Sequence, residues 1–159
     1  MAPRPFQRFL DTHSSDVWRY LVAAVGRHDA DDCFQETFMA ALRAYPDLRP
    51  GSSERAWVMT IAHRKTVDHF RARARRPVPA GDQLPESAGY DPPLRDEGGL
   101  WARVEALPPK QRGALLLRYA AGLSHAEVAV ALDCTEQAAR RSAHEGLKRL
   151  REVLGDVRV

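Results

Sequence analysis

The stretch GLSHAEVAVALDCTEQAARR, residues 122–141, contains the clearest local structural signals in the chain. Ser124 is followed three residues later by Glu127, the spacing of a capping box in which each side chain bonds the backbone N–H of the other residue. Leu123 and Val128 have the spacing of a hydrophobic staple around the same point. A helix is therefore expected to start at Ser124.

The residues that follow predict a helix-turn-helix. The first helix runs to Leu132, and a tight Asp-Cys-Thr turn leads into a final helix, which Thr135 and Glu136 cap and which extends to about Arg151 or Leu154. Such a motif places the first half of its second helix in the major groove of DNA. An αα-hairpin with a solvated basic face is the alternative interpretation.

Polar and basic side chains of that second helix are candidate DNA contacts. Arginine can bond guanine in bidentate fashion, and lysine or arginine at the flanks of the helix neutralises phosphate. The candidates are Thr135, Gln137, Arg140, Arg141, His144 and Lys148.

Two more helices are expected upstream of the motif, and a linker precedes them. A short helix lies near 100–106, and a second, over 110–121, starts after Pro108-Pro109, because a first-turn proline gives up no intrahelical hydrogen bond. Residues 77–100 hold five prolines and four glycines and show no hydrophobic periodicity. Such a segment cannot bury enough apolar surface to pack as an element.

The rest of the chain is patterned as helices. Apolar residues recur at three- and four-residue steps, with no sustained alternation of the strand type. We therefore expect an all-α protein of two small helical domains, residues 1–76 and 101–159, joined by a flexible linker, residues 77–100.

The first domain is expected to contain three helices. The first ends at Gly26 in the left-handed conformation, and it could break at Ser14 or Ser15. The third is capped by Ser52 or Ser53. Carboxylates favour the start of the second helix through capping and the helix dipole, and those expected there are Asp29, Asp31 and Asp32.

Each of these helices has one apolar face, which predicts the core. The second helix buries Phe34, Phe38, Leu42 and Tyr45, and the third buries Trp57, Val58, Ile61, Ala62 and Phe70.

Charge is spread unevenly along the chain, although the net charge is only +3. Residues 55–76 carry seven basic side chains and one acidic side chain, whereas residues 77–100 carry one basic and five acidic. A short, strongly basic stretch beside an acidic one predicts a surface that binds a polyanion. The aromatic residues within 55–76 suit contact with unstacked bases as well as phosphates.

Several classes of protein are not expected. No window reaches the roughly 18 to 20 apolar residues of a membrane span, and the first residues lack a signal-peptide core, so the cytoplasm is the expected compartment. Cys33 and Cys134 are too far apart for a metal knuckle, and His63 and His69, six apart, do not share a helix face. No phosphate-binding glycine loop or catalytic arrangement is present, so neither an enzyme nor a cofactor or small-molecule substrate is expected.

Three segments together resemble a known family. DADDCFQETFMAALRAYPDL (29–48), SERAWVMTIAHRKTVDHFRARARR (53–76) and LPPKQRGALLLRYAAGLSHAEVAVALDCTEQAARR (107–141) are similar, in that order, to the motifs of bacterial RNA polymerase sigma factors of the extracytoplasmic-function group. The resemblance covers nearly the whole chain. It implies a factor that binds core RNA polymerase, recognises the minus-10 and minus-35 elements of promoter DNA, and helps to open the duplex and initiate transcription.

The resemblance also implies residue roles. The polymerase-binding positions are Asp31, Asp32, Gln35 and Glu36. The loop 47–53 aligns with the loop that pockets a flipped base, and Arg140, Arg141 and His144 align with the minus-35 reading positions. Members of the group are often held inactive by an anti-sigma factor, which is a further partner to expect. The minus-10 reading helix corresponds to Arg64, Lys65, Asp68, His69 and Arg71, and the basic residues Arg73 and Arg75 extend it.

The chain departs from the family pattern in the helix-turn-helix. Asp133 stands where glycine is usual, Glu145 where a basic residue is usual and Gly146 where alanine is usual. Ala139 and Ala143 replace larger apolar residues, which is expected to thin the packing of the last helix. These changes are expected to weaken or alter minus-35 binding.

Two other functions compete with initiation. One is a stand-alone helix-turn-helix regulator that does not engage polymerase, and the other is an interaction protein that sequesters a partner through the first domain. The acidic QETF-type segment argues against the stand-alone regulator, which needs no helix of that kind.

Overall fold

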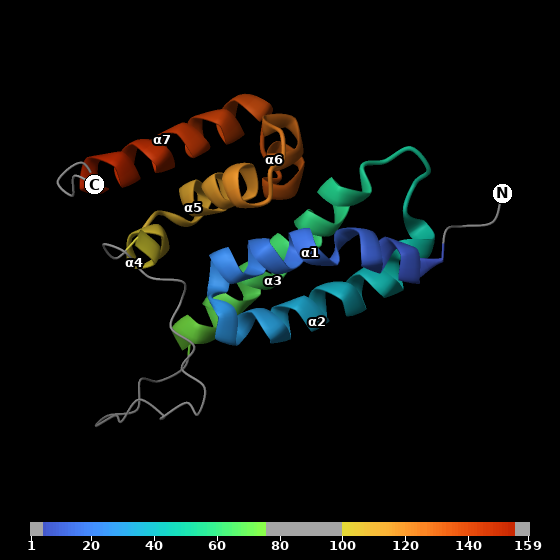
Figure 1. Cartoon of the computed structure of the whole chain (residues 1–159). Coiled ribbons are helices and arrows are strands. Elements are labelled where there is room, and N and C mark those ends of the chain that lie inside the picture. The colour runs from blue at the N-terminus through green and yellow to red at the C-terminus, as the bar shows by residue number, and fades with distance from the viewer. Residues whose placement is uncertain (1–4, 76–99, 155–159) are drawn as a thin grey trace, which may run out of the picture.

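The computed structural model describes residues 5–75 and 100–154 (Figure 1). These residues are arranged as helices, with no strand among them, which confirms the all-α prediction. The N-terminal helices are α1 (Phe6–Val25), α2 (Arg27–Ala44), the single 3-10 turn η1 (Tyr45–Asp47) and α3 (Glu54–Arg75). The C-terminal helices are α4 (Leu100–Glu105), α5 (Pro109–Leu115), the π-helical turn η2 (Leu116–Ala120), α6 (His125–Leu132) and α7 (Glu136–Leu154).

The N-terminal helices pack against one another around aromatic rings. Phe9 is fully buried, and its ring lies 5.3 Å from that of Tyr45 and 5.6 Å from that of Trp57, centroid to centroid. The rings of Phe34 and Phe38 on α2 lie 4.8 Å apart, centroid to centroid, and are tilted by 54°. Such tilted and edge-to-face pairs are favourable beyond the apolar area that they bury.

Three expectations for the first helices were wrong. Helix α1 continues without a break through both serines. It ends at Gly26, whose φ is positive at 84° while its ψ of 161° lies outside the left-handed helical region. Helix α2 then starts at Arg27 without a side-chain cap, so Asp31 and Asp32 lie inside the helix and do not cap it.

The predicted apolar face of α2 also contained one error. Leu42 is 54% exposed, whereas its neighbour Ala41 is completely buried. Helix α2 packs on both α1 and α3. The small side chain of Ala41 is enough to fill the buried position at this contact. Leu42 therefore belongs to the surface.

Helix α3 starts as predicted but buries more than predicted. The Oγ atom of Ser53 accepts a hydrogen bond from the N–H of Ala56 at 3.2 Å, which confirms Ser53 as the cap. Val58 and Ala62 are buried, as expected, but Met59 and Thr66 are buried as well. A second side of α3 is therefore covered, and the C-terminal helices cover it, since α3 packs on α6.

The helix-turn-helix signals are confirmed. Ser124 Oγ accepts from the N–H of Glu127 at 3.1 Å, and the carboxylate of Glu127 accepts from the N–H of Ser124 at 3.0 Å. Leu123 and Val128 are fully buried. Asp133 ends α6 in the left-handed conformation (φ 53°, ψ 54°).

Helix α7 lies close against α5 because its inner residues are small. Ala139 and Ala143 are buried. A Cβ atom built on Gly146 would lie 3.1 Å from the carbonyl oxygen of Gln111 on α5, so an alanine there would be crowded. The small residues thus bring the two helices together, and the packing is not thinned as expected.

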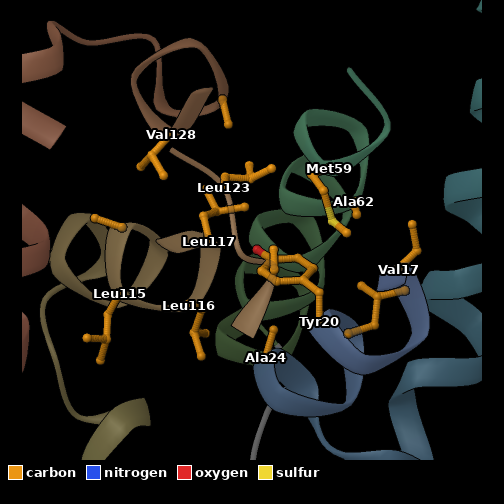
Figure 2. Packing of buried hydrophobic residues seen from close by; sticks show 14 of the residues in the cluster. Val17, Tyr20, Ala24, Met59, Ala62, Leu115, Leu116, Leu117, Leu123 and Val128 are labelled. Carbon is orange, nitrogen blue, oxygen red and sulfur yellow. The ribbon is translucent and has the colours of Figure 1, made fainter. Parts of the chain in front are cut away.

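Figure 1 shows the C-terminal helices lying over α1 and α3, and one hydrophobic cluster runs through both sets. Figure 2 shows Tyr20 and Met59 on the side of the N-terminal helices that faces Leu117 and Leu123. All four side chains are at most 1% exposed. We call this contact, where η2 and α6 pack on α1 and α3, the seam.

Candidate polymerase-binding and DNA-binding surfaces

The acidic and polar residues of α2 form one exposed face. The four candidates for partner binding are all exposed there: Asp31, Asp32, Gln35 and Glu36. The opposite side of the helix is buried against α1 and α3 through Ala30, Cys33, Thr37, Phe38 and Ala41. The helix therefore separates packing residues from residues that are free to meet a partner.

Two exposed hydrophobic residues extend this face, and the sequence interpretation did not assign them to it. Met39 is 55% exposed and Leu42 is 54% exposed. Met39 lies four residues after Gln35, and Leu42 lies seven after it, so they follow Gln35 along the same side of the helix. The α2 face is defined here as the four polar candidates together with Met39 and Leu42. Helical spacing could have identified Met39, whereas Leu42 lies at the boundary with the buried side, where spacing alone does not decide its exposure.

The carboxylates of α2 affect the buried thiol between them. Burial, followed by the nearby carboxylates of Glu36, Asp29 and Asp32, raises the pKa of Cys33 to about 11. A thiol with such a pKa stays protonated and is a poor nucleophile or metal ligand. Cys33 therefore acts as a small apolar core residue, as expected.

The basic residues of α3 form a second exposed face. The exposed candidates for minus-10 contact are Arg64, Asp68, Arg71, Arg73 and Arg75. Lys65 is half-buried, and so is His69, whose Nε2 atom lies 3.3 Å from the Asp29 carboxylate on α2. These two side chains are thus partly involved in packing α3 on α2, while the five exposed ones are free for a ligand.

A further residue of α3, His63, lies between this basic face and the seam. Its Nδ1 atom is 3.2 Å from the hydroxyl of Tyr20 on α1. Burial, and then the positive charges of Arg112 and Arg64, lower its pKa to about 4. The imidazole is therefore neutral near pH 7, and no sequence signal pointed to its buried position.

The loop before α3 is exposed at its turn. Gly51 has a φ of 87°, which glycine adopts without strain, and the N–H of Ser52 donates to the carbonyl of Arg49 at 3.2 Å. Both Gly51 and Ser52 are exposed. The loop that aligns with a base pocket is thus accessible beside the N-terminus of α3.

The third exposed face lies on α7. All six candidates for minus-35 contact are exposed: Thr135, Gln137, Arg140, Arg141, His144 and Lys148. The hydroxyl of Thr135 accepts from the N–H of Ala138 at 3.1 Å, so this residue caps the helix. Arg140 lies 3.3 Å from the carboxylate of Glu136 one turn earlier, an exposed pair that is worth little and is easily exchanged for phosphate.

The departures from the family pattern have structural explanations. The carboxylate of Glu145 accepts a hydrogen bond from the Gln111 side chain at 3.3 Å, so it is directed toward α5. Asp133 holds the left-handed position that usually takes glycine. Neither residue interrupts the row of exposed minus-35 candidates on α7.

The candidate residues of α3 and the helix-turn-helix turn share one groove. It encloses about 530 Å³, and Arg64, Asp68 and Arg71 line one wall, while residues 130–133 line the other. None of the α7 candidates lines it. The minus-10 and minus-35 candidates are therefore separate surfaces, held on neighbouring elements.

Two other kinds of feature are absent from the described residues. Across residues 5–75 and 100–154, no helix combines the length and apolar character needed to cross a membrane. In the same part of the chain, no three histidine, cysteine, aspartate or glutamate side chains are grouped so as to hold a metal ion.

Both halves of the chain match described protein families. Residues 9–76 match the family model "Sigma-70 region 2", and residues 98–150 match the model "Sigma-70, region 4". The first match spans the N-terminal helices and the second spans the C-terminal helices.

Curated relatives agree over most of the chain. The ECF RNA polymerase sigma factor SigD of Mycobacterium tuberculosis is 36% identical over 90% of this chain and 74% of its own length. The RNA polymerase sigma factor CarQ of Myxococcus xanthus is 32% identical over 98% of this chain and 92% of its own. The ECF RNA polymerase sigma factor SigC of M. tuberculosis is 32% identical over 82% and 73%.

Solved structures share the fold. The sigma factor RpoE of Bartonella quintana, solved with the anti-sigma factor NepR, superposes with a TM-score of 0.75 at 23% identity, covering 96% of this chain and 98% of that one. CnrH, solved with the cytosolic domain of CnrY, gives a TM-score of 0.73 at 21% identity, covering 95% and 88%. Together with the two family models and the relatives, these findings show that the chain belongs to the ECF RNA polymerase sigma factors, which recognise promoters and initiate transcription.

Proposed function

We propose that three separate exposed faces of this sigma factor carry out its function: the α2 face binds core RNA polymerase, the basic face of α3 contacts the minus-10 element, and the α7 face contacts the minus-35 element. The observation that supports this assignment best is their separation. Each face lies at the position of its family motif, each is exposed, and each is backed by buried residues of the same helix.

The α2 face suits a protein partner that is basic opposite the first part of the face and apolar opposite Met39 and Leu42. Glu36 and the neighbouring aspartates supply negative charge, which orients the partner and speeds its association. Met39 and Leu42 offer apolar side chains, which contribute more affinity when they become buried. Methionine also adapts its shape to a partner surface.

The α3 face suits DNA whose strands are separating. Its four exposed arginines can neutralise phosphates. Asp68 is exposed among them, and its carboxylate can only accept hydrogen bonds, for example from the amino group of cytosine. It therefore reads base edges and repels phosphate. Flipping a base costs a few kcal/mol. Contacts to the extruded base and to the backbone offset this cost.

The α7 face suits double-stranded DNA. Arg140 and Arg141 lie in the first half of the second helix of the helix-turn-helix, which enters the major groove. His144, the third reading position, lies one turn after Arg140, and Lys148 lies further along, where it meets the phosphates that flank the groove.

The chain divides, in this proposal, into a polymerase- and minus-10-binding domain (1–76), a linker (77–100) and a minus-35-binding domain (101–159). The family matches over 9–76 and 98–150 support this division. Residues 77–99 of the linker lie outside the described residues, whereas Leu100, its last residue in the prediction, begins α4. The protein acts in the cytoplasm, where polymerase and DNA are, and it acts as an initiation factor without catalysing a reaction of its own.

An anti-sigma protein is a further partner in this proposal. Two sigma factors of the same fold were solved in complexes with such proteins, one with NepR and one with the cytosolic domain of CnrY. The exposed α2 face is the surface that an inhibitor would have to cover in order to block polymerase.

Binding of variants to purified core polymerase tests the α2 assignment. Glu36→Arg and Leu42→Ala should each weaken core binding at least tenfold, because one reverses a charge and the other removes an apolar anchor. Asp11→Arg, at an exposed acidic residue of α1, is the control of equal charge change and should bind as the unchanged protein does. Equal affinity for all four proteins would overturn the assignment, and a protein that binds DNA but never polymerase would support the stand-alone regulator.

A further inference from the structure

A cavity of about 400 Å³ lies where α1, α3 and α5 meet, at the end of α3. Its apolar lining comes from Ala24 of α1, Val67 and Phe70 of α3, and Leu116 of η2. The volume is within the range of roughly 300–1,000 Å³ that small-molecule ligands occupy. Of the side chains in the three proposed faces, Arg71 alone is among the described residues that line it.

The cavity has a buried inner end and an exposed rim. Tyr20, Ala24 and Leu116, which line the inner end, are at most 7% exposed. Ala74 of α3 and Lys110 of α5, which also line the cavity, are exposed. A ligand can therefore enter past the exposed residues and reach the buried ones.

The polar groups at the inner end already have partners. The hydroxyl of Tyr20 lies 3.2 Å from the Nδ1 atom of His63. The hydroxyl of Thr66 donates to the carbonyl of His63 at 2.7 Å. A polar ligand group would find few open partners there and would lose its contact with water, so an apolar group is favoured at this end.

The walls of the cavity have apolar surface that is not fully covered. Val67 and Phe70 on α3 and Leu132 on α6 all line the cavity, and all three are only half-buried. An alkyl chain in the cavity would remove more of this surface from water, which is favourable. The walls thus favour an apolar ligand body.

The charged residues that line the cavity are all positive. They are Arg71, Lys110 and Arg112, and the described residues of the lining include no aspartate or glutamate. Charges of one sign around a concave site attract a ligand of the opposite sign. The rim therefore favours an anion.

Arg112 is placed to bind the anionic group. Its guanidinium carbon lies 4.2 Å from the centre of the Phe70 ring, which fixes the plane of the fork. Within the described residues it donates one hydrogen bond, from Nη1 to the carbonyl of Glu105 at 3.0 Å. Burial lowers the pKa of Arg112, and the negative charge of Glu105 offsets only part of this effect. A guanidinium has five N–H donors, so donors remain that a carboxylate can bond in bidentate fashion.

We propose that this cavity binds a free medium-chain carboxylate, whose alkyl chain lies against Ala24, Phe70 and Leu116 and whose carboxylate pairs with Arg112 and Lys110. A nucleotide would suit the rim but would place polar groups against apolar walls. A cationic amphiphile would suit the walls but would be repelled at the rim. This inference goes beyond the proposed function and does not depend on the assignment of the three faces.

Titration of the free full-length chain with decanoate, below the concentration at which decanoate forms micelles, tests the site. Calorimetry should show one decanoate bound per chain, and nuclear magnetic resonance should show shifts of the methyl groups of Ala24, Val67 and Leu116. Acetate and decylamine should not bind, and decanol should bind at least tenfold more weakly, because it lacks the charge. Equal binding of decanol and decanoate, or several decanoates bound at scattered positions, would overturn the proposal.

Two substitutions on α3 test the position of the ligand. Ala74→Phe places a ring at the rim and should weaken decanoate binding at least tenfold. Ala72→Phe is the matched control, since Ala72 is exposed on the same helix and does not line the cavity. It should bind decanoate as the unchanged chain does. Equal affinity of the two variants would contradict the site.

Charge reversal on α5 tests the pairing of the carboxylate. Lys110→Glu should weaken binding about tenfold or more, and Arg112→Gln should do the same. Arg151→Glu, at an exposed residue of α7 outside the lining, is the control of equal charge change. Arg71 is left unchanged because it also belongs to the basic face of α3. Circular dichroism shows whether Arg112→Gln folds; Lys110→Glu and Ala74→Phe test the site without it. Binding that is insensitive to Lys110→Glu and Arg112→Gln would contradict the pairing.

The competing occupant is the acidic segment of the same chain that joins the two sets of helices. Its carboxylates are Asp82, Glu86, Asp91, Asp96 and Glu97. Replacing them with asparagine and glutamine should leave the methyl resonances of Ala24 and Leu116 unchanged if the cavity is free for a ligand. If decanoate fails to bind the unchanged chain and this replacement shifts those resonances, the segment is the occupant and the proposal is overturned.

Discussion

The N-terminal and C-terminal helices build their cores from different side chains. The N-terminal helices pack large rings, with Phe9 in contact with Phe38, Tyr45 and Trp57. The C-terminal helices pack leucines, alanines and a glycine, and α5 and α7 approach closely at Gly146. The ring cluster around Phe9 lies within the N-terminal helices, whereas Leu117 and Leu123 of the second core become buried against Tyr20 and Met59 of the other set.

This difference indicates how each half keeps its shape. Large buried rings supply the N-terminal helices with stability that does not depend on the rest of the chain. The C-terminal helices depend more on local backbone signals, such as the capping box and the left-handed turn, and on the seam. Predictions about the two halves should therefore differ in size and in mechanism.

The largest effect is expected in the aromatic core. Phe9→Ala should lower the free energy of unfolding of the N-terminal helices by about 3–5 kcal/mol, because it removes a fully buried ring and leaves a cavity. Urea titration followed by circular dichroism measures this. Leu42→Ala, at a residue 54% exposed, is the control and should change stability by no more than ~0.5 kcal/mol. A small effect of Phe9→Ala would remove the contrast between the two cores.

The next largest effect is expected from pH at the seam. His63 has a pKa of about 4 in the folded chain and the ordinary value of 6.5 when unfolded, so the unfolded chain takes up a proton first as pH falls. The contribution of the neutral imidazole to the free energy of unfolding should be fully present above pH 6.5 and should decrease progressively down to pH 4. The groups that face His63 are Tyr20 from α1, Arg64 from its own helix and Arg112 from α5, with Asp68, Arg71 and Asp133 in the adjoining groove.

The free energy of unfolding, measured by urea titration from pH 7.5 to pH 4.5, tests this dependence. His63→Asn keeps a hydrogen-bonding side chain that does not titrate, and its free energy of unfolding should depend less on pH over this range. A dependence of the same size in the asparagine variant would assign the effect to the neighbouring carboxylates.

A smaller effect is expected at the start of α6. Ser124→Ala removes one half of the capping box and should destabilise the C-terminal helices by about 1 kcal/mol. Bonding to Ser124, mainly through its backbone, lowers the pKa of Glu127, and the variant should raise that pKa by removing the hydroxyl contribution. Thermal unfolding and a carboxyl titration by nuclear magnetic resonance measure the two changes. Ser15→Ala, exposed within α1, should leave both unchanged.

The smallest effect is a gain at the turn of the helix-turn-helix. Asp133→Gly should stabilise the C-terminal helices by ~0.5–1 kcal/mol, because glycine adopts a φ of 53° without the strain of a side chain. Asp133→Ala should destabilise them, since alanine lacks the side chain that helps aspartate tolerate this conformation. Stabilisation by alanine would show that the turn is not strained.

Local signals in the sequence were reliable where they depend on neighbouring residues. The capping box at Ser124, the start of α3 after Ser53 and the cap at Thr135 are all present in the structure. Each involves residues within about four positions, so no knowledge of the rest of the fold is needed.

Expectations failed where a distant element decides the outcome. Met59 is buried because α6 covers a second side of α3, and His63 is half-buried for the same reason. Leu42 was placed in the core because helical spacing cannot tell whether Ala41 or Leu42 faces a close neighbour. The exposed candidates on α2, α3 and α7 were identified from motifs, while their partners stay predictions until binding is measured.

Transcription reconstituted from purified components tests the central claim most directly. The protein is mixed with core RNA polymerase and a library of promoter sequences, and the start sites of the transcripts are mapped. We predict transcripts from promoters that share a minus-10 and a minus-35 motif, with Arg64→Ala reducing promoter opening and the Arg140→Ala, Arg141→Ala pair reducing dependence on the minus-35 motif. Transcripts that do not depend on the added protein, or dependence that survives all these substitutions, would contradict the account.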